Sequence, residues 1–494
     1  MSADLGWWVA TALVLADWVI RIIALIIIPR DRKPTAAMSW LLAIFLIPFV
    51  GIVLFLLIGN VKLPRKRRDR QLEINGIIAE RVDAAAWASD LTPDRATWPA
   101  WFATATEQNR VLGALPAVGG NRAELIGDYG ASIDRMAADI DTAEHFVHVE
   151  FYIVAIDDTT RGFFAAMERA VQRGVTVRLL LDHVASRRVS VHEATFAELD
   201  RIGVKWAFLL PVQPFQGKYQ RPDLRNHRKL VVVDGRVAYT GSQNLIDRSY
   251  DSPKNLKRGL MWQELVTRVT GPTVAAINAV FLSDWYSETD EVLLETEHVP
   301  AAQVEADASP DALVCQVVPS GPAYEQENNL RLFLALVASA QERVIITSPY
   351  FVPDEAMMYA ITSARLRGLE VQLFVSEIGD QGSVWHAQRS YYGALLRAGV
   401  RIFLYPGPYI LHAKHLSIDD DVAVIGSSNM DIRSFNLNFE ISLLVRGKTF
   451  VADMREVEAG YRAIGRELTL AEWEQEPGTA TFLDGVARLT SALQ

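Results

Sequence analysis

Cysteine is almost absent from this chain of 494 residues, which contains one, together with nine histidines. The single Cys315 excludes an internal disulfide framework and is typical of a reducing compartment. No Cys/His cluster has the spacing of zinc ligands. We interpret the run EHFVHVEFYI, which holds His145, His148 and Glu150, as a strand entering the core. The sequence therefore implies no metal and no cofactor.

Disorder is excluded as well, because half of the residues are hydrophobic. The length exceeds that of one ordinary hydrophobic core, so two or three folded units are expected. Beyond residue 70, 55 Asp and Glu outnumber 39 Lys and Arg. Residues 1–70 carry ten Lys and Arg against four Asp and Glu, whereas the whole chain has a net charge of −10. This distribution argues against general nucleic-acid binding and favours contact with an anionic membrane surface.

Two long apolar segments, Leu5–Ile28 and Ala36–Leu57, begin the chain. Each is close to the ~20 residues that a helix needs to cross a bilayer. The short charged join PRDRKP predicts a transmembrane helical hairpin in residues 1–60. A cleaved signal peptide is disfavoured, because no Lys or Arg precedes the first segment and a second follows at once. Pro48 and Gly51 would permit a kink or a re-entrant bend in the second segment.

The basic residues around these segments predict their orientation. The join holds three Lys and Arg, and the flank VKLPRKRRDR after the second segment holds six. The positive-inside bias therefore places everything after residue 60 in the cytoplasm of the cell. We expect residues 61–120 to form a basic collar and a helical connector.

The rest of the chain contains a long internal repeat, which we interpret as a duplicated domain. Three segments match at separations of 194, 196 and 185 residues: Arg173–Asp182 with Arg367–Ser376, Gly203–Pro211 with Gly399–Gly407, and His227–Ser249 with His412–Ser434. The order is preserved and only the intervening lengths differ. The predicted lobes are residues 121–305 and 306–494.

Within each lobe, strand-like runs such as VTVRLLL alternate with helical runs such as TRGFFAAMERAVQR. This alternation predicts an α/β fold with mixed, mostly parallel sheets flanked by helices. Two such lobes related by a pseudo-twofold axis would face each other across a cleft, and ligands prefer such clefts.

One motif, His-x-Lys-x4-Asp-x6-Gly-Ser-x-Asn, occurs in both lobes. Its members are His227, Lys229, Asp234, Gly241, Ser242 and Asn244, then His412, Lys414, Asp419, Gly426, Ser427 and Asn429. Residues i and i+2 of a strand share a face, roughly 6.6 Å apart. Histidine and lysine would therefore point into one space, where lysine binds a phosphate oxygen and histidine acts as nucleophile or acid.

The other motif positions have different roles. The aspartate lies seven residues after the histidine, on the opposite side of a strand, and Asp234-Gly235 has the composition of a hairpin turn. We interpret Asp234 and Asp419 as structural rather than chemical. The Gly-Ser-x-Asn segment can offer an amide and backbone N–H groups to an anion. A single motif could be a solvated strand edge, but two intact copies favour a symmetrical phosphate site.

The doubled motif resembles the signature of the phospholipase D superfamily. With the apolar hairpin and the segment SPYFVPDEAM, the chain resembles the bacterial cardiolipin synthases of that superfamily over nearly its whole length. The resemblance implies that one histidine attacks the phosphodiester of a phosphatidylglycerol, expels glycerol and forms a phosphatidyl-histidine. The glycerol hydroxyl of a second phosphatidylglycerol then attacks and gives cardiolipin.

The resemblance also implies roles for individual residues. His227 is expected to be the nucleophile and His412 the general acid and then the base. Lys229, Lys414, Asn244 and Asn429 would hold phosphate oxygens, and Ser242 and Ser427 would lie with them. The family counts Asp234 and Asp419 as motif members. It also places a carboxylate behind each histidine to fix its tautomer, and Glu264 and Glu440 occupy the matching positions.

Two alternatives stay open. A phospholipase D-type hydrolase or another phosphatidyl transferase would use the same residues, and a non-catalytic lipid-binding protein would retain only the fold. The expected partners are phosphatidylglycerol and anionic lipids, without nucleic acid, at the bacterial inner membrane. The sequence leaves open the second lipid, phosphatidylglycerol or phosphatidylethanolamine, the acyl preference, the oligomeric state and which histidine attacks.

Overall fold

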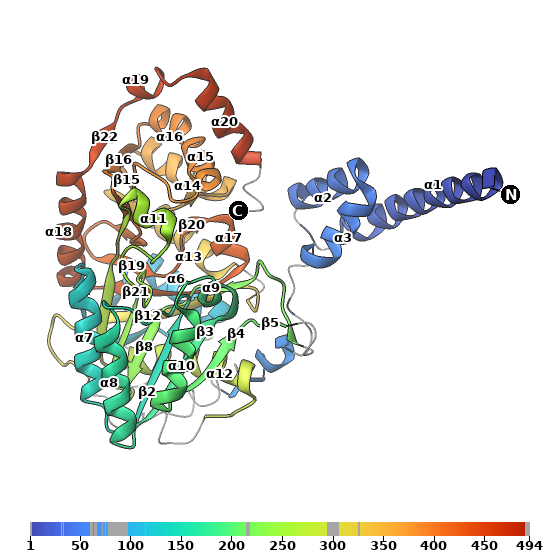
Figure 1. Ribbon diagram of the computed structural model, residues 1–494. Helices are drawn as coiled ribbons and strands as arrows, with labels where there is room; N and C mark the ends of the chain where they lie inside the picture. The colour runs from blue at the N-terminus through green and yellow to red at the C-terminus, as the bar shows by residue number, and fades with distance from the viewer. Residues whose placement is uncertain are drawn as a thin grey trace. The chain divides into compact units, whose positions relative to one another are not determined.

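The computed structural model of the chain is drawn in Figure 1. It describes residues 2–30, 32, 34–59, 63, 67–71, 73–74, 76–77, 97–113, 115–213, 218–293, 306–324 and 327–489. The chain divides into two compact units. The smaller comprises residues 1–62 and 221–223, and the larger comprises residues 63–220 and 224–494.

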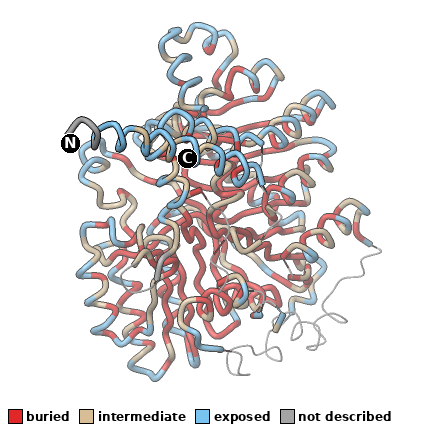
Figure 2. The backbone as a smooth tube through the Cα atoms, turned by 90° about the vertical axis from the view of Figure 1, so that its right-hand side faces the viewer, coloured by how far each residue is buried: buried red, intermediate tan, exposed pale blue. Residues whose placement is uncertain are grey.

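The smaller unit contains three apolar helices, α1 (Ser2–Ile27), α2 (Pro34–Leu46) and α3 (Pro48–Ile58). Within α1, residues Gly6–Ile27 are long and apolar enough to cross a membrane. These residues are mostly exposed, and the helix beside the N-terminus is largely pale blue in Figure 2. The transmembrane hairpin of two spanning helices expected in residues 1–60 was wrong, because α1 alone among the described helices is long and apolar enough to cross. The segment Ala36–Leu57 is divided at Ile47, whose ψ of 75° is not helical, next to the Pro48 at which a bend was expected to be possible. Pro48 follows and begins a new helix.

Helices α2 and α3 fold back on each other. A Cβ atom added to Gly51 would lie 2.8 Å from the Cα atom of Ile44, so glycine permits this close approach. At the end opposite the Ile47 break, the Arg32 guanidinium before α2 donates a hydrogen bond to the carbonyl oxygen of Gly59 after α3. The start of α2 and the end of α3 therefore lie together, and the pair forms a short helical hairpin.

The expected basic collar is partly neutralised within the larger unit. The guanidinium of Arg67 lies 2.5 Å from the carboxylate of Glu288. Arg70 forms an ion pair with Asp290. Both carboxylates lie at the end of α12 (Thr273–Thr289). These two bases hold the start of the larger unit against α12, so they are not free cations for lipid. The other bases of the collar except Arg68 lie outside the described residues, as does much of the expected connector.

A continuous sheet runs through the larger unit, in the strand order β22-β16-β15-β13-β18-β19-β21-β12-β1-β11-β9-β8-β2-β3-β4. The strands of the first lobe are β1 (Val118–Ile126), β2 (Phe146–Phe151), β3 (Thr176–Asp182), β4 (Lys205–Leu209), β8 (Leu230–Val233), β9 (Val237–Gly241) and β11 (Val266–Thr270). Those of the second are β12 (Leu313–Ser320), β13 (Arg343–Thr347), β15 (Glu370–Ser376), β16 (Arg401–Tyr405), β18 (His415–Ile418), β19 (Val422–Gly426), β21 (Asn438–Arg446) and β22 (Arg466–Leu468).

The expectation of mostly parallel sheets was wrong. Along this order, the parallel pairs are β2–β3, β3–β4, β13–β15 and β15–β16, and the other neighbouring strands pair antiparallel. The physical reason is the motif itself. Its short turns join β8 to β9 and β18 to β19 as hairpins, which can only be antiparallel. The βαβ pattern holds only at the outer part of each lobe.

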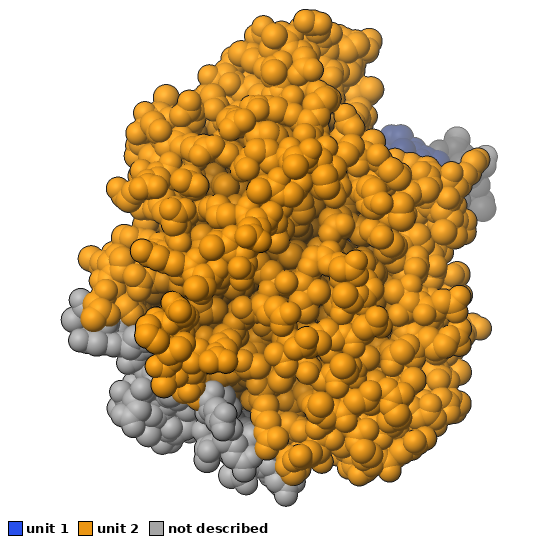
Figure 3. All heavy atoms as spheres, turned by 90° about the vertical axis from the view of Figure 1, so that its left-hand side faces the viewer, with its two compact units in different colours: residues 1–62, 221–223 blue, residues 63–220, 224–494 orange. Residues whose placement is uncertain are grey.

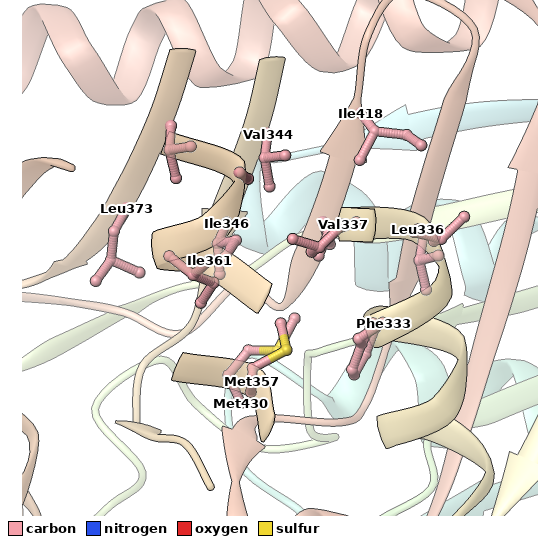
Figure 4. Close-up of a cluster of buried hydrophobic side chains, with 14 of the residues drawn as sticks. Phe333, Leu336, Val337, Val344, Ile346, Met357, Ile361, Leu373, Ile418 and Met430 are labelled. Atoms are coloured by element: carbon pink, nitrogen blue, oxygen red, sulfur yellow. The ribbon is translucent and has the colours of Figure 1, made fainter. Parts of the chain in front are cut away.

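Helices cover both faces of the sheet. In the first lobe, α7 (Tyr129–Asp141) and α8 (Arg161–Gln172) cover one face and α12 the other. In the second lobe, the corresponding helices are α13 (Asn328–Ser339), α14 (Glu355–Leu366) and α18 (Lys448–Ile464). Phe333, Leu336 and Val337 recur at helical spacing on α13 and pack with Ile346 and Met357, as Figure 4 shows.

The two lobes share one of their hydrophobic cores. Phe281 of α12 and Phe450 of α18 belong to the same cluster of buried residues as Val317 of the central strand β12. On the face drawn in Figure 3, the atoms of the larger unit form one continuous packed surface. The lobes are therefore joined by a common core. The lobe limits at 121–305 and 306–494 stay predictions.

Candidate active site

The two copies of the motif lie at corresponding places in the two lobes. Asp234 and Gly235 have φ values of 49° and 65° and make the turn between β8 and β9, as the sequence predicts. Histidine and lysine, however, are not on the strand as expected. His227 and Lys229 lie in the extended segment just before β8, and His412 and Lys414 lie just before β18.

Each histidine is positioned by the opposite lobe. Strand β7 (Arg225–Asn226) pairs in parallel with the start of β21, and the backbone N–H of His227 donates to the carbonyl of Phe439 at 2.8 Å. In the same way, β17 (Tyr409–Leu411) pairs with β10 (Met261–Gln263), and the N–H of His412 donates to the carbonyl of Gln263 at 2.7 Å. The residues just before each motif thus pair with a strand of the opposite lobe, and the motif then continues into a strand of its own lobe. We call this boundary between the lobes the seam.

The carboxylates behind the histidines are exchanged between the lobes. Nδ1 of His227 lies 3.1 Å from both carboxylate oxygens of Glu440 and 3.0 Å from the carbonyl oxygen of Ser427. Nδ1 of His412 lies 2.7 Å from Glu264. An ionised carboxylate accepts the Nδ1 proton, which leaves the lone pair of each ring on Nε2. The pairing therefore sets the tautomer that a nucleophile or a base needs.

Burial sets the charge of these groups. It lowers the pKa of both His227 and His412 to about 4, with the neighbouring lysines acting in the same direction and the glutamates opposing them. Burial alone would raise the pKa of Glu440, but His227 and Lys229 outweigh it and hold the pKa below its usual value. At neutral pH both rings are neutral and both carboxylates are ionised.

The two motif lysines are buried with the histidines and glutamates, and this burial lowers the pKa of both. Burial and the charge of Lys414 lower the pKa of Lys229 to about 7. Burial lowers the pKa of Lys414 to about 8. Their Nζ atoms donate to the carbonyls of His227 and His412 at 2.6 Å and 2.7 Å. Two like charges held close together and poorly solvated favour an anion between them, so the site suits a phosphate group.

The motif aspartates lie away from this phosphate site. Asp234 accepts hydrogen bonds from the backbone N–H groups of residues 144, 145 and 146, at 2.7 to 2.9 Å. Asp419 does the same for residues 341, 342 and 343. Each carboxylate ties the motif turn to the start of the neighbouring strand, β2 or β13. The geometry gives them a structural role.

The serines and asparagines surround the carboxylates. Ser427 donates to Glu440, and Ser242 accepts from the N–H of Leu265, beside Glu264. Asn244 donates to the Tyr250 hydroxyl at 2.8 Å, while Oδ1 of Asn429 has no hydrogen-bond partner among the described residues. The serines therefore support the glutamates, and Asn429 retains capacity for a ligand.

Several residues of the site have no counterpart in the motif. The Tyr250 hydroxyl donates to Glu264 at 3.1 Å, and this extends the chain Glu264–His412. The rings of Tyr152 and Tyr350 lie 5.1 Å and 6.2 Å from those of His227 and His412. The sequence signal for them was an aromatic residue after each of the apolar runs HVEF and VIITSP, since Tyr152 and Tyr350 lie shortly after the matching strands β2 and β13.

A buried ion pair lies between the motif and α12. Arg228, between His227 and Lys229, pairs with Asp284 and donates from Nε to the carbonyl of Glu440 at 3.0 Å. Among the described residues, no group of three His, Cys, Asp or Glu has the geometry of a metal site.

This geometry agrees with comparisons to known proteins. A family profile described as "Cardiolipin synthase, PLD-like domain" matches residues 136–285 and 333–458, more than half of the chain. The chain belongs to this family of cardiolipin synthases with phospholipase D-like domains. A second profile, "Phospholipase_D-nuclease N-terminal", matches residues 19–60.

Individual cardiolipin synthases are similar over almost their whole length. Cardiolipin synthase A of Pectobacterium atrosepticum is 32% identical over 480 residues, 94% of each chain. The same enzyme of Serratia proteamaculans is 31% identical over 92% of each chain. A crystal structure of phosphatidylserine synthase from Haemophilus influenzae shares the fold, with a TM-score of 0.58 and 16% identity over 79% of this chain and 99% of that one.

Proposed function

We propose that the chain condenses two phosphatidylglycerol molecules into cardiolipin and glycerol through a phosphatidyl-histidine. The observation that supports this most is the pair of neutral histidines, each with Nδ1 bonded to a buried carboxylate. Nζ of Lys414 lies 3.1 Å from Nε2 of His412, so the lysine is next to the atom that would transfer the proton. One ring can form the covalent bond while the other transfers the proton.

In the first step, Nε2 of His227 bonds to phosphorus and the bond from phosphorus to the glycerol oxygen breaks. His412 gives its proton to that oxygen. The incoming phosphate anion raises the pKa of the histidines above the value in the empty site, so that His412 can hold this proton. Lys229 and Lys414 neutralise the charge on the phosphate oxygens, and Asn244 and Asn429 flank them.

In the second step, neutral His412 accepts the proton from the glycerol hydroxyl of another phosphatidylglycerol. The oxygen attacks phosphorus, and the bond to Nε2 of His227 breaks. The proton and the histidine are both restored. The two histidines are alike in geometry, so the geometry does not distinguish the nucleophile from the acid. The assignment of His227 as nucleophile and His412 as acid follows the family pattern.

The N-terminal unit supports a membrane location with a particular topology. Helix α1 crosses the membrane once, while α2 and α3 enter and return on one side, because Arg32 and Gly59 lie together. This arrangement brings the bases of the join and of the following flank to the same side, in agreement with the positive-inside bias. The lobes then lie at the cytoplasmic face of the bacterial inner membrane.

The decisive test is a defined-lipid assay. The full-length protein in nanodiscs containing phosphatidylglycerol as the lipid substrate should release cardiolipin and glycerol in equal amounts. Phosphatidic acid as the main product would instead indicate a hydrolase. A phosphatidyl group trapped on the protein should be absent in His227→Ala.

A further inference from the structure

A small pocket with a mostly apolar lining lies beside His412 in the second lobe. It is lined by residues from three segments, which include Tyr350, Ser376, Asp380, Gln381, Trp385 and Ile410. Ile410 is two residues before His412, and the Tyr350 ring lies 6.2 Å from the His412 ring. Its volume of about 10 Å³ is close to the minimum for one water-sized group. The pocket therefore suits a single hydroxyl group next to the proton-transferring histidine.

Only one of the two carboxylate oxygens of Asp380 accepts a hydrogen bond from the described residues. Tyr350 donates to Oδ2 at 2.9 Å, and Gln381 in turn donates to the Tyr350 hydroxyl at 3.3 Å. Oδ1 is buried and has no hydrogen-bond partner in the described part of the chain. A buried carboxylate oxygen without a donor is costly, so this atom is a site for a hydroxyl donor from a ligand.

The pocket is held in place by both lobes. Lys254 and Arg258, at the two ends of helix α11 (Pro253–Arg258) of the first lobe, donate to the carbonyls of Asp380 and Gly379 at 3.2 Å and 2.9 Å. Ser376 accepts the backbone N–H of Leu411, the residue before His412, at 2.8 Å. The position of Asp380 relative to His412 is thus fixed by direct contacts.

The corresponding strand end of the first lobe carries a carboxylate that is already occupied. Asp182 ends β3 as Ser376 ends β15, but its carboxylate is occupied by Arg225 and by the N–H groups of residues 184, 185 and 226. The two lobes therefore differ at this strand end: the carboxylate of Asp182 is occupied, whereas Oδ1 of Asp380, after β15, has no donor among the described residues.

We propose that Asp380, positioned by Tyr350, binds a free hydroxyl of the glycerol headgroup and so selects polyol alcohols as leaving group and acceptor. This inference rests on the proposed function and names the specificity determinant of the same site. An alcohol without a second hydroxyl would leave Oδ1 unpaired and would bind less well.

The test compares two acceptors of similar size, 1,2-propanediol and 1-propanol, with full-length protein and labelled phosphatidylglycerol. The wild type should transfer the phosphatidyl group preferentially to the diol. Asp380→Asn and Asp380→Glu should reduce this preference about 10- to 100-fold, mainly through KM for the diol, while transfer to 1-propanol survives. Glu377→Gln, which changes a carboxylate paired with Arg466 outside the pocket, should keep the wild-type preference.

Two outcomes would overturn the proposal. One is an unchanged diol preference in both Asp380 variants. The other is equal loss of transfer to both alcohols, because the proposal requires that transfer to 1-propanol persists. Failure of the wild type to make cardiolipin would refute the proposed function instead, so the two failures are distinguishable.

Discussion

Glu440 of the second lobe accepts the Nδ1 proton of His227 in the first lobe, with both carboxylate oxygens at 3.1 Å. The reverse pair, Glu264 with His412, completes the exchange. Among the described residues, the oxygens that accept from Nδ1 of each histidine all come from the opposite lobe. The duplicated fold is therefore one catalytic unit, and its seam is part of the active site.

We expect Glu440→Gln to lower kcat about 10²- to 10⁴-fold, because an amide at this position no longer requires the Nδ1–H tautomer of His227. The exchange also predicts which residues are coupled. Glu440→Gln should add little to the loss in His227→Ala, since both changes disable the same ring. Kinetics of the single and double variants with phosphatidylglycerol measure this. A Glu440→Gln variant coupled to His412 rather than His227 would contradict the exchanged pairing.

The lowered pKa values of Lys229 and Lys414, about 7 and about 8, predict an alkaline limit to activity. Below these values both lysines are charged and attract phosphate, and the attraction is lost as pH rises through them. We therefore expect a further fall in kcat/KM between about pH 7 and 8, beyond the decline caused by deprotonation of His412 with its pKa of about 4, because kcat/KM reports the free enzyme. The limit in kcat should lie higher, since bound phosphate favours the charged lysines. In Lys414→Arg the limit should move to higher pH, and an unchanged limit there and in Lys229→Arg would refute the assignment.

Asp234 should matter for stability more than for chemistry. Asp234→Ala removes an acceptor for three backbone N–H groups, which we expect to cost about 2–4 kcal/mol. Thermal unfolding should show a lower Tm, while the specific activity of the folded fraction at low temperature stays within about tenfold of the wild type. Asp420→Asn, a mostly exposed neighbour of the corresponding Asp419, is the control and should leave Tm unchanged. A fully folded but inactive Asp234→Ala would show a chemical role.

The sequence was sufficient for the parts of the site that local spacing determines. The duplication, the motif positions and the turn at Asp234-Gly235 all follow from short segments. The direction of the strands did not follow, because alternation of helix and strand predicts βαβ units and does not reveal the antiparallel pairs in the middle of each lobe. The motif hairpins, recognised as turns, were the available evidence for them.

The exchange of glutamates could not be predicted from spacing, since it depends on the pairing of β7 with β21 and of β10 with β17. These partners lie far apart in the sequence, and each pairing involves only two or three residues. Asp380 belongs to neither copy of the motif, so the sequence did not single it out. Its role depends on an oxygen left without a donor, which only three-dimensional contacts reveal.

The topology of the N-terminal unit gives a prediction that distinguishes one crossing from two. If α1 alone crosses, the residues before it lie outside the inner membrane and the join after it lies in the cytoplasm. Two crossings, with the lobes in the cytoplasm, would reverse both positions. Single reporter cysteines at Ser2 and Arg30 sample the two places. The natural Cys315 is buried, so it should not react with the label. We expect an impermeant maleimide to label Ser2→Cys in intact spheroplasts and Arg30→Cys only after lysis. Labelling in the opposite order would show that α2 and α3 together cross the membrane.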